Sequence, residues 1–202
     1  MIKFIKIFVV LALGFGAGMV SALWMAGLIG GKTLDSFADV KAGNWRSDWS
    51  IGAPSADPYL RARIARHGLL ALSKQEAVYF NLSLDDQGAP LKEECQYELS
   101  GSGQDALWWS ITLYDSTSYL PMNTDNSMSV DATTIGEAQN WTALIADAKP
   151  VGGGHWLSSR NAGQFDLTMR IYRPSNAVLD TPETHVNPPQ LRRLSCRERG
   201  GT

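Results

Sequence analysis

The chain has 202 residues, of which 19% are charged and 44% are hydrophobic, and its formal net charge is −2. Three lysines are the only charged residues before Thr33, so the remainder holds 15 Lys and Arg against 20 Asp and Glu, a formal charge of −5. This acidic balance argues against nucleic-acid binding, while about 170 residues suffice for one domain with a hydrophobic core.

Residues 7–31 form an uncharged apolar run with lysines on both sides. A helix of about 20 apolar residues crosses a bilayer, so we expect residues 1–32 to be an uncleaved signal anchor. The alternative is a signal peptide cleaved after residues 20–22, although the apolar run continues beyond that point. Basic residues before the run outweigh those after it, which places the N-terminus in the cytoplasm and the following head outside.

Small residues recur at every fourth position of this run and would form one stripe on a helix. Such a stripe lets two helix backbones approach closely, so it predicts a homodimer or a partner helix in the membrane. The alternative is that Gly and Ala are simply common in transmembrane helices. The members of the stripe are Gly14, Gly18, Ala22, Ala26 and Gly30.

Residues 33–56 have no regular period and are expected to be a connector, followed by a head of residues 57–202. Asp57 and Pro58 suit the N-cap and the first position of a helix, and Gly68 suits its end. Farther along, short runs alternate between apolar and polar residues, the pattern of half-buried strands. We therefore expect a mainly β fold, an antiparallel β-sandwich or jelly-roll-like head with one short helix. The expected strands are residues 78–84, 96–100, 107–115, 128–132, 141–146 and 165–172.

Cys95 and Cys196 both lie in the head. In an oxidising compartment an even pair of cysteines is most simply a disulfide, and two unrelated buried thiols are the alternative. The chain has no Walker loop, dinucleotide-binding glycine fingerprint or nucleophile elbow, so no cofactor is predicted. The three histidines lack the spacing of metal ligands, and residues 123–127 lack the Gly and Glu of a calcium loop. We expect no metal and an Asx turn there.

Arg170 lies in the middle of an expected strand, with Tyr172 on the same face. Thr112 and Tyr114 share the polar face of another strand, so the four side chains line one cleft if the two strands are neighbours. A guanidinium there could hold a carboxylate or sulfate, and a structural ion pair is the alternative. Tryptophans offer sugars or partners a large flat surface but also fill β cores. The further candidate ligand-binding residues are Trp108, Trp156, His155 and Arg61.

Several stretches of the head carry a recognisable pattern: residues 57–62, 76–80, 107–115, 156–157 and 170–174. They resemble the bacterial domain of unknown function family 1214, and Trp-Ser-Ile-Thr-Leu-Tyr-Asp at 109–115 is the most specific part. The resemblance covers about residues 57–191 and implies a β-rich head. A family loop that usually reads Asn-Trp-Leu-Pro is His-Trp-Leu-Ser here. Family members often accompany domain of unknown function family 1254, which implies a companion protein, and the family supplies no established catalytic residues.

These observations predict a single-pass protein of a bacterial inner membrane with its head in the periplasm. It would act as a binding or assembly module in cell-envelope function. The alternative is an enzyme acting on a glycan or an acidic small molecule, with Arg170 and Tyr114 in a cleft and His155 as a candidate acid or base. An enclosed polar pocket would favour the enzyme, and a flat aromatic patch would favour the binding module.

Overall fold

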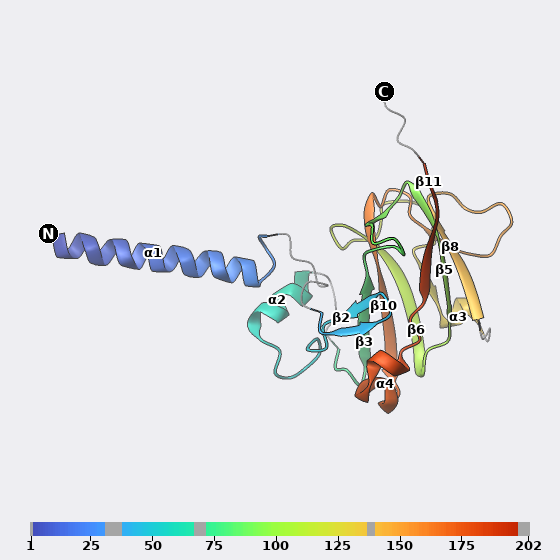
Figure 1. Cartoon of the computed structure of the whole chain (residues 1–202), viewed down its shortest axis with the longest axis horizontal. Helices are drawn as coiled ribbons and strands as arrows, with labels where there is room; N and C mark the ends of the chain where they lie inside the picture. The colour runs from blue at the N-terminus through green and yellow to red at the C-terminus, as the bar shows by residue number, and fades with distance from the viewer. Residues whose placement is uncertain (1, 31–37, 67–71, 137–139, 198–202) are drawn as a thin grey trace, which may run out of the picture.

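The computed structural model describes residues 2–30, 38–66, 72–136 and 140–197. A long N-terminal helix, α1 (Ile2–Met25), projects away from a body built mainly of strands, as Figure 1 shows. We call this body, from β1 to β11, the head. The fold is mainly β with antiparallel sheets, which confirms the predicted fold class at this level. The prediction of one short helix in the head was wrong, because its described residues form a few.

Helix α1 is exposed over most of its length. Its segment Lys3–Met25 is long and apolar enough to cross a membrane, and its most apolar stretch is wholly unburied. The helix ends earlier than the apolar run. The Leu28 N–H donates to the carbonyl of Leu23 at 2.9 Å, and the Gly27 N–H donates to that of Trp24 at 3.1 Å. Gly27 has a φ of 71°, so these bonds form a Schellman cap.

This cap shortens the predicted stripe of small residues. Gly14, Gly18 and Ala22 lie within α1, whereas Ala26 and Gly30 follow its last residue. Gly30 has a φ of 87°, a conformation outside a right-handed helix. The prediction of one helix through residue 31 was therefore wrong at its end, because hydropathy does not register the cap.

The larger sheet has the strand order β1-β2-β3-β10-β6-β7, with β4 paired to β10. Its three long strands pair antiparallel, so that Arg170 of β10 lies opposite Tyr79 of β3 and Ser110 of β6. The bounds are β1 (Val40–Ala42), β2 (Trp45–Ser47), β3 (Ala77–Leu82), β4 (Leu91–Lys92), β6 (Ala106–Asp115), β7 (Ser129–Asp131) and β10 (Gln164–Pro174).

The smaller sheet has the order β11-β5-β8-β9. Its β8–β9 pair is parallel, which departs from the expected antiparallel pattern. The bounds are β5 (Cys95–Ser102), β8 (Asn140–Ala146), β9 (His155–Ser158) and β11 (Gln190–Cys196). The short helices α3 (Ala132–Ile135), α4 (Asn176–Asp180) and α5 (Pro182–His185) join strands of the head.

The hairpin of β1 and β2 lies inside residues 33–56, which we expected to be an irregular connector. Ala42 pairs with Trp45 across a two-residue turn, and Gly43 has the positive φ of 57° that such a turn requires at its first position. Trp45 is completely buried and donates its indole N–H to the carbonyl of Pro189 at 2.7 Å. Strands of three residues are too short to show a period, which explains the error.

The two sheets share one hydrophobic core. Trp109 of β6 stacks on Trp141 of β8 at 5.2 Å between ring centres, and Tyr97 of β5 meets Phe165 of β10 edge-on at 5.9 Å. Trp109 is 5% exposed in this core, whereas Leu107, at the second position of β6, is 69% exposed.

A disulfide joins Cys95 to Cys196. The two residues lie opposite each other at one end of the β5–β11 pair, 101 positions apart in the sequence. The bond fastens the last strand of the head to its middle.

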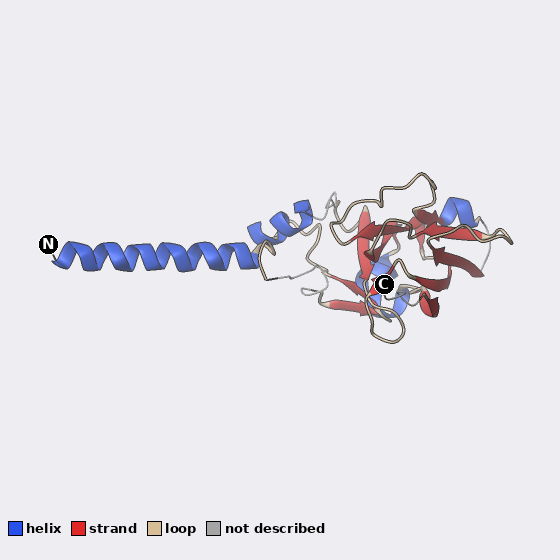
Figure 2. Ribbon diagram, turned by 90° about the horizontal axis from the view of Figure 1, so that it is seen from above, coloured by secondary structure: helices blue, strands red, loops and turns tan. Residues whose placement is uncertain are grey.

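Helix α2 (Pro58–Arg66) covers part of the larger sheet's outer face, where Leu60 and Ile64 pack with Ala77 and Tyr79. The carboxylate of Asp57 accepts hydrogen bonds from two backbone N–H groups in the first turn, at 2.8 and 3.1 Å. The predicted helix start is thus confirmed, while the predicted end at Gly68 lies outside the described residues. Figure 2 shows α2 between α1 and the strands, as does Figure 1.

Candidate functional site

Five of the predicted site residues lie on one surface, the outer face of the larger sheet. Residues of β10 alternate, so that Phe165, Leu167, Met169 and Ile171 are buried in the core while their neighbours point outward. Because β10 pairs with β6, outward residues of the two strands are adjacent. We call this surface the Arg170 face, after its central residue; its predicted members are Arg170, Tyr172, Thr112, Tyr114 and Trp108.

The guanidinium of Arg170 is held by a neutral partner. Its Nη2 donates a hydrogen bond to the hydroxyl of Tyr114 at 2.9 Å, and its central carbon lies 5.2 Å from the centre of the Tyr114 ring. A cation over an aromatic ring is attracted to the ring's electrons. Among the described residues, no carboxylate lies within ion-pair distance of Arg170. The guanidinium is therefore positioned by a phenol and not by a direct ion pair.

Tyr79 adds a second phenol opposite Arg170. Burial raises the pKa of Tyr79, and the nearby Tyr172 phenol adds to this, whereas a backbone hydrogen bond with Leu72 and the charge of Arg170 act in the other direction. A phenol with a raised pKa stays protonated at neutral pH. Tyr79 therefore leaves the positive charge of Arg170 in place.

Trp108 and Tyr172 form an aromatic end to the Arg170 face. They lie opposite each other on β6 and β10, with 5.3 Å between ring centres and a tilt of 53°. Trp108 donates its indole N–H to the hydroxyl of Thr133 at 2.9 Å, which fixes the ring. Both side chains are half-buried, and Tyr172 also packs against the residues under α2. The face thus carries a fixed apolar surface beside a cation.

Polar groups complete the centre of the face. Thr168 donates to the side-chain oxygen of Asn81 at 2.9 Å, and Ser110 is nearly buried between its neighbours. Asp131 lies opposite Ser110 on β7, but its carboxylate accepts the N–H groups of Thr133 and Thr134 as the cap of α3. This acid is therefore engaged in helix capping.

The other three predicted residues lie elsewhere. His155 and Trp156 belong to β9 in the smaller sheet, where Trp156 is buried and donates to the carbonyl of Ala146 at 3.0 Å. Arg61 lies on α2 and donates to the carbonyl of Ala56 at 3.0 Å. These residues therefore do not join the Arg170 face. The prediction could not separate them from it, because a linear sequence does not reveal which sheet a short strand joins.

The loop at residues 123–127 forms the expected Asx turn, with the Asp125 N–H donating to the side chain of Asn123 at 3.0 Å. Arg160 and Ser158 bind the carboxylate of Asp125, the former through an ion pair. In the described part of the chain, no group of three or more His, Cys, Asp and Glu is arranged to hold a metal ion.

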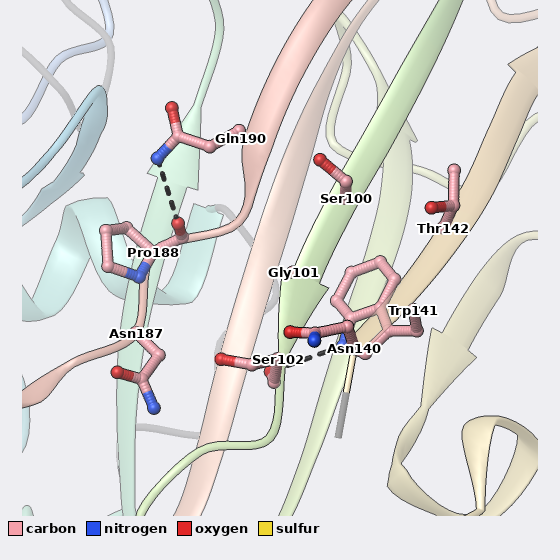
Figure 3. A pocket seen from close by; sticks show the side chains of 9 residues that line it. All are labelled: Ser100, Gly101, Ser102, Asn140, Trp141, Thr142, Asn187, Pro188 and Gln190. Carbon is pink, nitrogen blue, oxygen red and sulfur yellow. Dashed lines mark hydrogen bonds between the residues drawn. The ribbon is translucent and has the colours of Figure 1, made fainter. Parts of the chain in front are cut away.

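An open groove on the smaller sheet was not predicted from the sequence (Figure 3). It has a volume of about 460 Å³, and its lining is entirely uncharged. The outward positions of β5 and β8 supply hydroxyls and amides, but the segment that completes the groove comes from far along the chain. The alternation of polar and apolar residues in β5 and β8 could have predicted the part of the groove that these two strands supply. The lining residues are Ser100, Gly101, Ser102, Asn140, Trp141, Thr142, Asn187, Pro188 and Gln190.

Comparison with known structures supports the fold. The chain is similar to the crystal structure of the VPA0106 protein from Vibrio parahaemolyticus, with a TM-score of 0.58 and 18% identity, over 91% of this chain and 44% of that one. It therefore spans less than half of that protein, and the likeness concerns the fold alone. An uncharacterized protein from Burkholderia cenocepacia is similar with a TM-score of 0.44 and 13% identity, over 59% and 30% of the two chains.

No curated protein matches the chain. Residues 76–176 match the model of a family described as "Protein of unknown function (DUF1214)". This segment runs from just before β3 to the start of α4 and includes every predicted member of the Arg170 face. The chain therefore belongs to the DUF1214 family, as its strand sequences predicted.

Proposed function

We propose that this protein is a membrane-anchored binding module of the bacterial cell envelope. In this proposal residues 1–32 anchor it in the inner membrane, with the N-terminus in the cytoplasm and the head in the periplasm. The exposed apolar helix α1 and the lysines near its start support the anchor and its orientation. The disulfide of the head fits an oxidising compartment. We describe the head as an antiparallel β-sandwich that begins with β1, so the connector is shorter than residues 33–56.

The Arg170 face is the proposed binding surface, and its ligand carries an acidic group. A guanidinium presents a planar fork of donors that fits a carboxylate, phosphate or sulfate through two parallel hydrogen bonds. The phenol of Tyr114 fixes one side of this fork, and the ring pair of Trp108 and Tyr172 offers apolar contact to the rest of the ligand. An acidic sugar has both properties.

The observation that carries the proposal is the contrast between Arg170 and the paired arginines of the head. Arg160, Arg192, Arg193 and Arg197 each lie within ion-pair distance of a carboxylate, at exposed or half-buried sites. Arg170 is half-buried in the centre of a sheet and has a neutral phenol as its partner. Among the described residues, Arg170 has no ion-pair partner, so the structural ion pair that was the alternative is not seen there. An incoming anion would supply the opposite charge.

Binding fits this face better than catalysis. A general acid or base has to lie within hydrogen-bond reach of the substrate. The carboxylate of Asp131 caps a helix, the phenol of Tyr79 has a raised pKa, and His155 belongs to the other sheet.

A companion envelope protein and a homodimer through Gly14, Gly18 and Ala22 of α1 remain part of the proposal.

Titration of the full chain in lipid nanodiscs with glucuronate and with inorganic sulfate tests the binding proposal. Loss of a charge-assisted pair predicts that Arg170→Gln weakens binding about 10- to 100-fold. Arg192→Gln is the matched control, because it removes one guanidinium from β11 of the smaller sheet. Equal binding by both variants would refute the site. Alkaline phosphatase fused after the head tests orientation, and activity only in the cytoplasm would refute it.

A further inference from the structure

The end of α1 and helix α2 are joined by a buried arginine. The guanidinium of Arg63 in α2 donates a hydrogen bond from Nη1 to the carbonyl of Met25, the last residue of α1, at 2.7 Å. Arg63 is only 6% exposed. The negative end of the α1 dipole also favours a cation at this position. α2 is therefore held within one side-chain length of the point where α1 ends.

This position sets the depth of α2 relative to a bilayer. If α1 spans the membrane, its Schellman cap at Gly27 marks where the chain leaves the hydrocarbon. Trp24 lies one turn before the cap and is 42% exposed. Tryptophan is enriched at membrane–water interfaces, so this position suits it. Leu28 and Ile29 follow the cap and are also exposed. A helix tied to Met25 then lies at the level of the lipid headgroups.

The composition of α2 suits that level. Within an acidic head, α2 holds three arginines and no acidic residue. The neighbouring acid, Asp57, is engaged as the helix cap. The inner side of α2 packs on the sheet, whereas Tyr59, Arg61, Ala62 and Ala65 of its outer side are exposed. An exposed tyrosine, a cation and small residues allow close contact with a headgroup layer.

We infer that α2 lies against the outer surface of the membrane and that its outer side binds the phosphate groups of anionic phospholipids. This inference rests on the proposed insertion of α1. The charge complementarity of α2 and its continuity with the membrane-spanning helix commit the surface to lipid. The head as a whole is acidic, but the exposed Arg61 gives this side of α2 a local positive charge.

α2 covers one part of the sheet's outer face and the Arg170 face occupies the adjoining part, with Tyr172 in contact with both. Both views of the chain place α2 between α1 and this sheet (Figures 1 and 2). The Arg170 face therefore looks toward the bilayer and meets acidic groups presented at the membrane surface.

A single spin label tests the contact in the full chain. Both native cysteines are in the disulfide, so Ala62→Cys provides one labelling site on the exposed side of α2. Val151→Cys, in an exposed loop after β8, is the matched control. In nanodiscs of phosphatidylcholine with phosphatidylglycerol, the label at position 62 should be several-fold less accessible to a water-soluble nickel relaxant than the label at position 151. The same accessibility at both positions would overturn the inference.

Further variants separate lipid charge from simple proximity. Arg61→Gln should weaken the surface-bound state about five-fold in anionic nanodiscs and have no effect in pure phosphatidylcholine. Lys149→Gln, which removes one charge from an exposed site beyond β8, should have no effect in either lipid. An equal effect of the two variants would overturn the role of α2. If the chain fails to co-elute with nanodiscs, insertion of α1 itself is refuted, which distinguishes the two failures.

Discussion

Reduction of the Cys95–Cys196 disulfide gives a quantitative test of the proposed compartment. The bond closes a loop between residues 101 positions apart. In the chain-entropy model a loop of this length lowers the free energy of the folded state relative to the unfolded chain by about 4.7 kcal/mol, and measured values for native disulfides are about 2–5 kcal/mol. We therefore expect dithiothreitol to lower the free energy of unfolding of the head by about 2–5 kcal/mol.

The structure also predicts where the loss begins. Leu194, Ser195 and Cys196 are exposed at the end of β11, beyond the Arg193–Asp85 pair, and the Arg197–Asp147 pair that follows is largely exposed and contributes little. The pairing with β5 should therefore open first at the disulfide end after reduction. Hydrogen exchange should accelerate in β11 while it remains slow in the central strands β3, β6 and β10.

Urea unfolding of the full chain in detergent micelles, followed by tryptophan fluorescence, provides the assay. In a thermal scan of the same samples, a loss of 3 kcal/mol would lower the melting temperature by about 6–12 °C. The double variant Cys95→Ala/Cys196→Ala is the control, since dithiothreitol should not change its stability. A difference below about 1 kcal/mol between oxidised and reduced protein would contradict the argument that the head depends on an oxidising compartment.

Three further results follow from single residues. Gly101→Ala should cost about 1–3 kcal/mol in urea unfolding, because a Cβ there would lie 2.8 Å from a tryptophan ring, whereas Gly103→Ala meets no atom within 4 Å and should be neutral. Gly18→Leu should abolish any α1 dimer seen by crosslinking without unfolding the head, because its Cβ meets no atom within 4 Å in one chain. The backbone N–H of Leu60, which donates to the Asp57 carboxylate, is the main cause that lowers the pKa of Asp57 below 3.8. The ionised carboxylate therefore stabilises α2 above pH 3.8, and this stabilisation is lost as the pH falls through the lower folded pKa. Helix content that rises on acidification would contradict this.

The long strands were predictable because their side chains alternate. In β6 and β10 the alternation identified both the strand and the side that faces the core, and thereby placed Arg170, Thr112 and Tyr114 outward. Adjacency of β6 and β10 was only a condition in that argument, and the structure supplies it. The Arg170 face follows from these two facts.

The errors have physical causes as well. The strands β1, β2 and β4 have two or three residues each, too few for a period, and their pairing with distant strands decides their conformation. The end of α1 depends on the backbone of Gly27 and its hydrogen bonds, which a count of apolar residues does not register. His155 and Trp156 lie in β9, whose parallel pairing with β8 places them in the other sheet.

The most direct test of the Arg170 face as a binding surface is a map of chemical-shift changes when glucuronate is added to the isotope-labelled full chain in nanodiscs. Binding at this face predicts changes at the outward positions of β3, β6 and β10, centred on Arg170 and Tyr114, and their loss in Arg170→Gln. Changes confined to the uncharged groove beside Trp141, or changes that persist in Arg170→Gln, would contradict it.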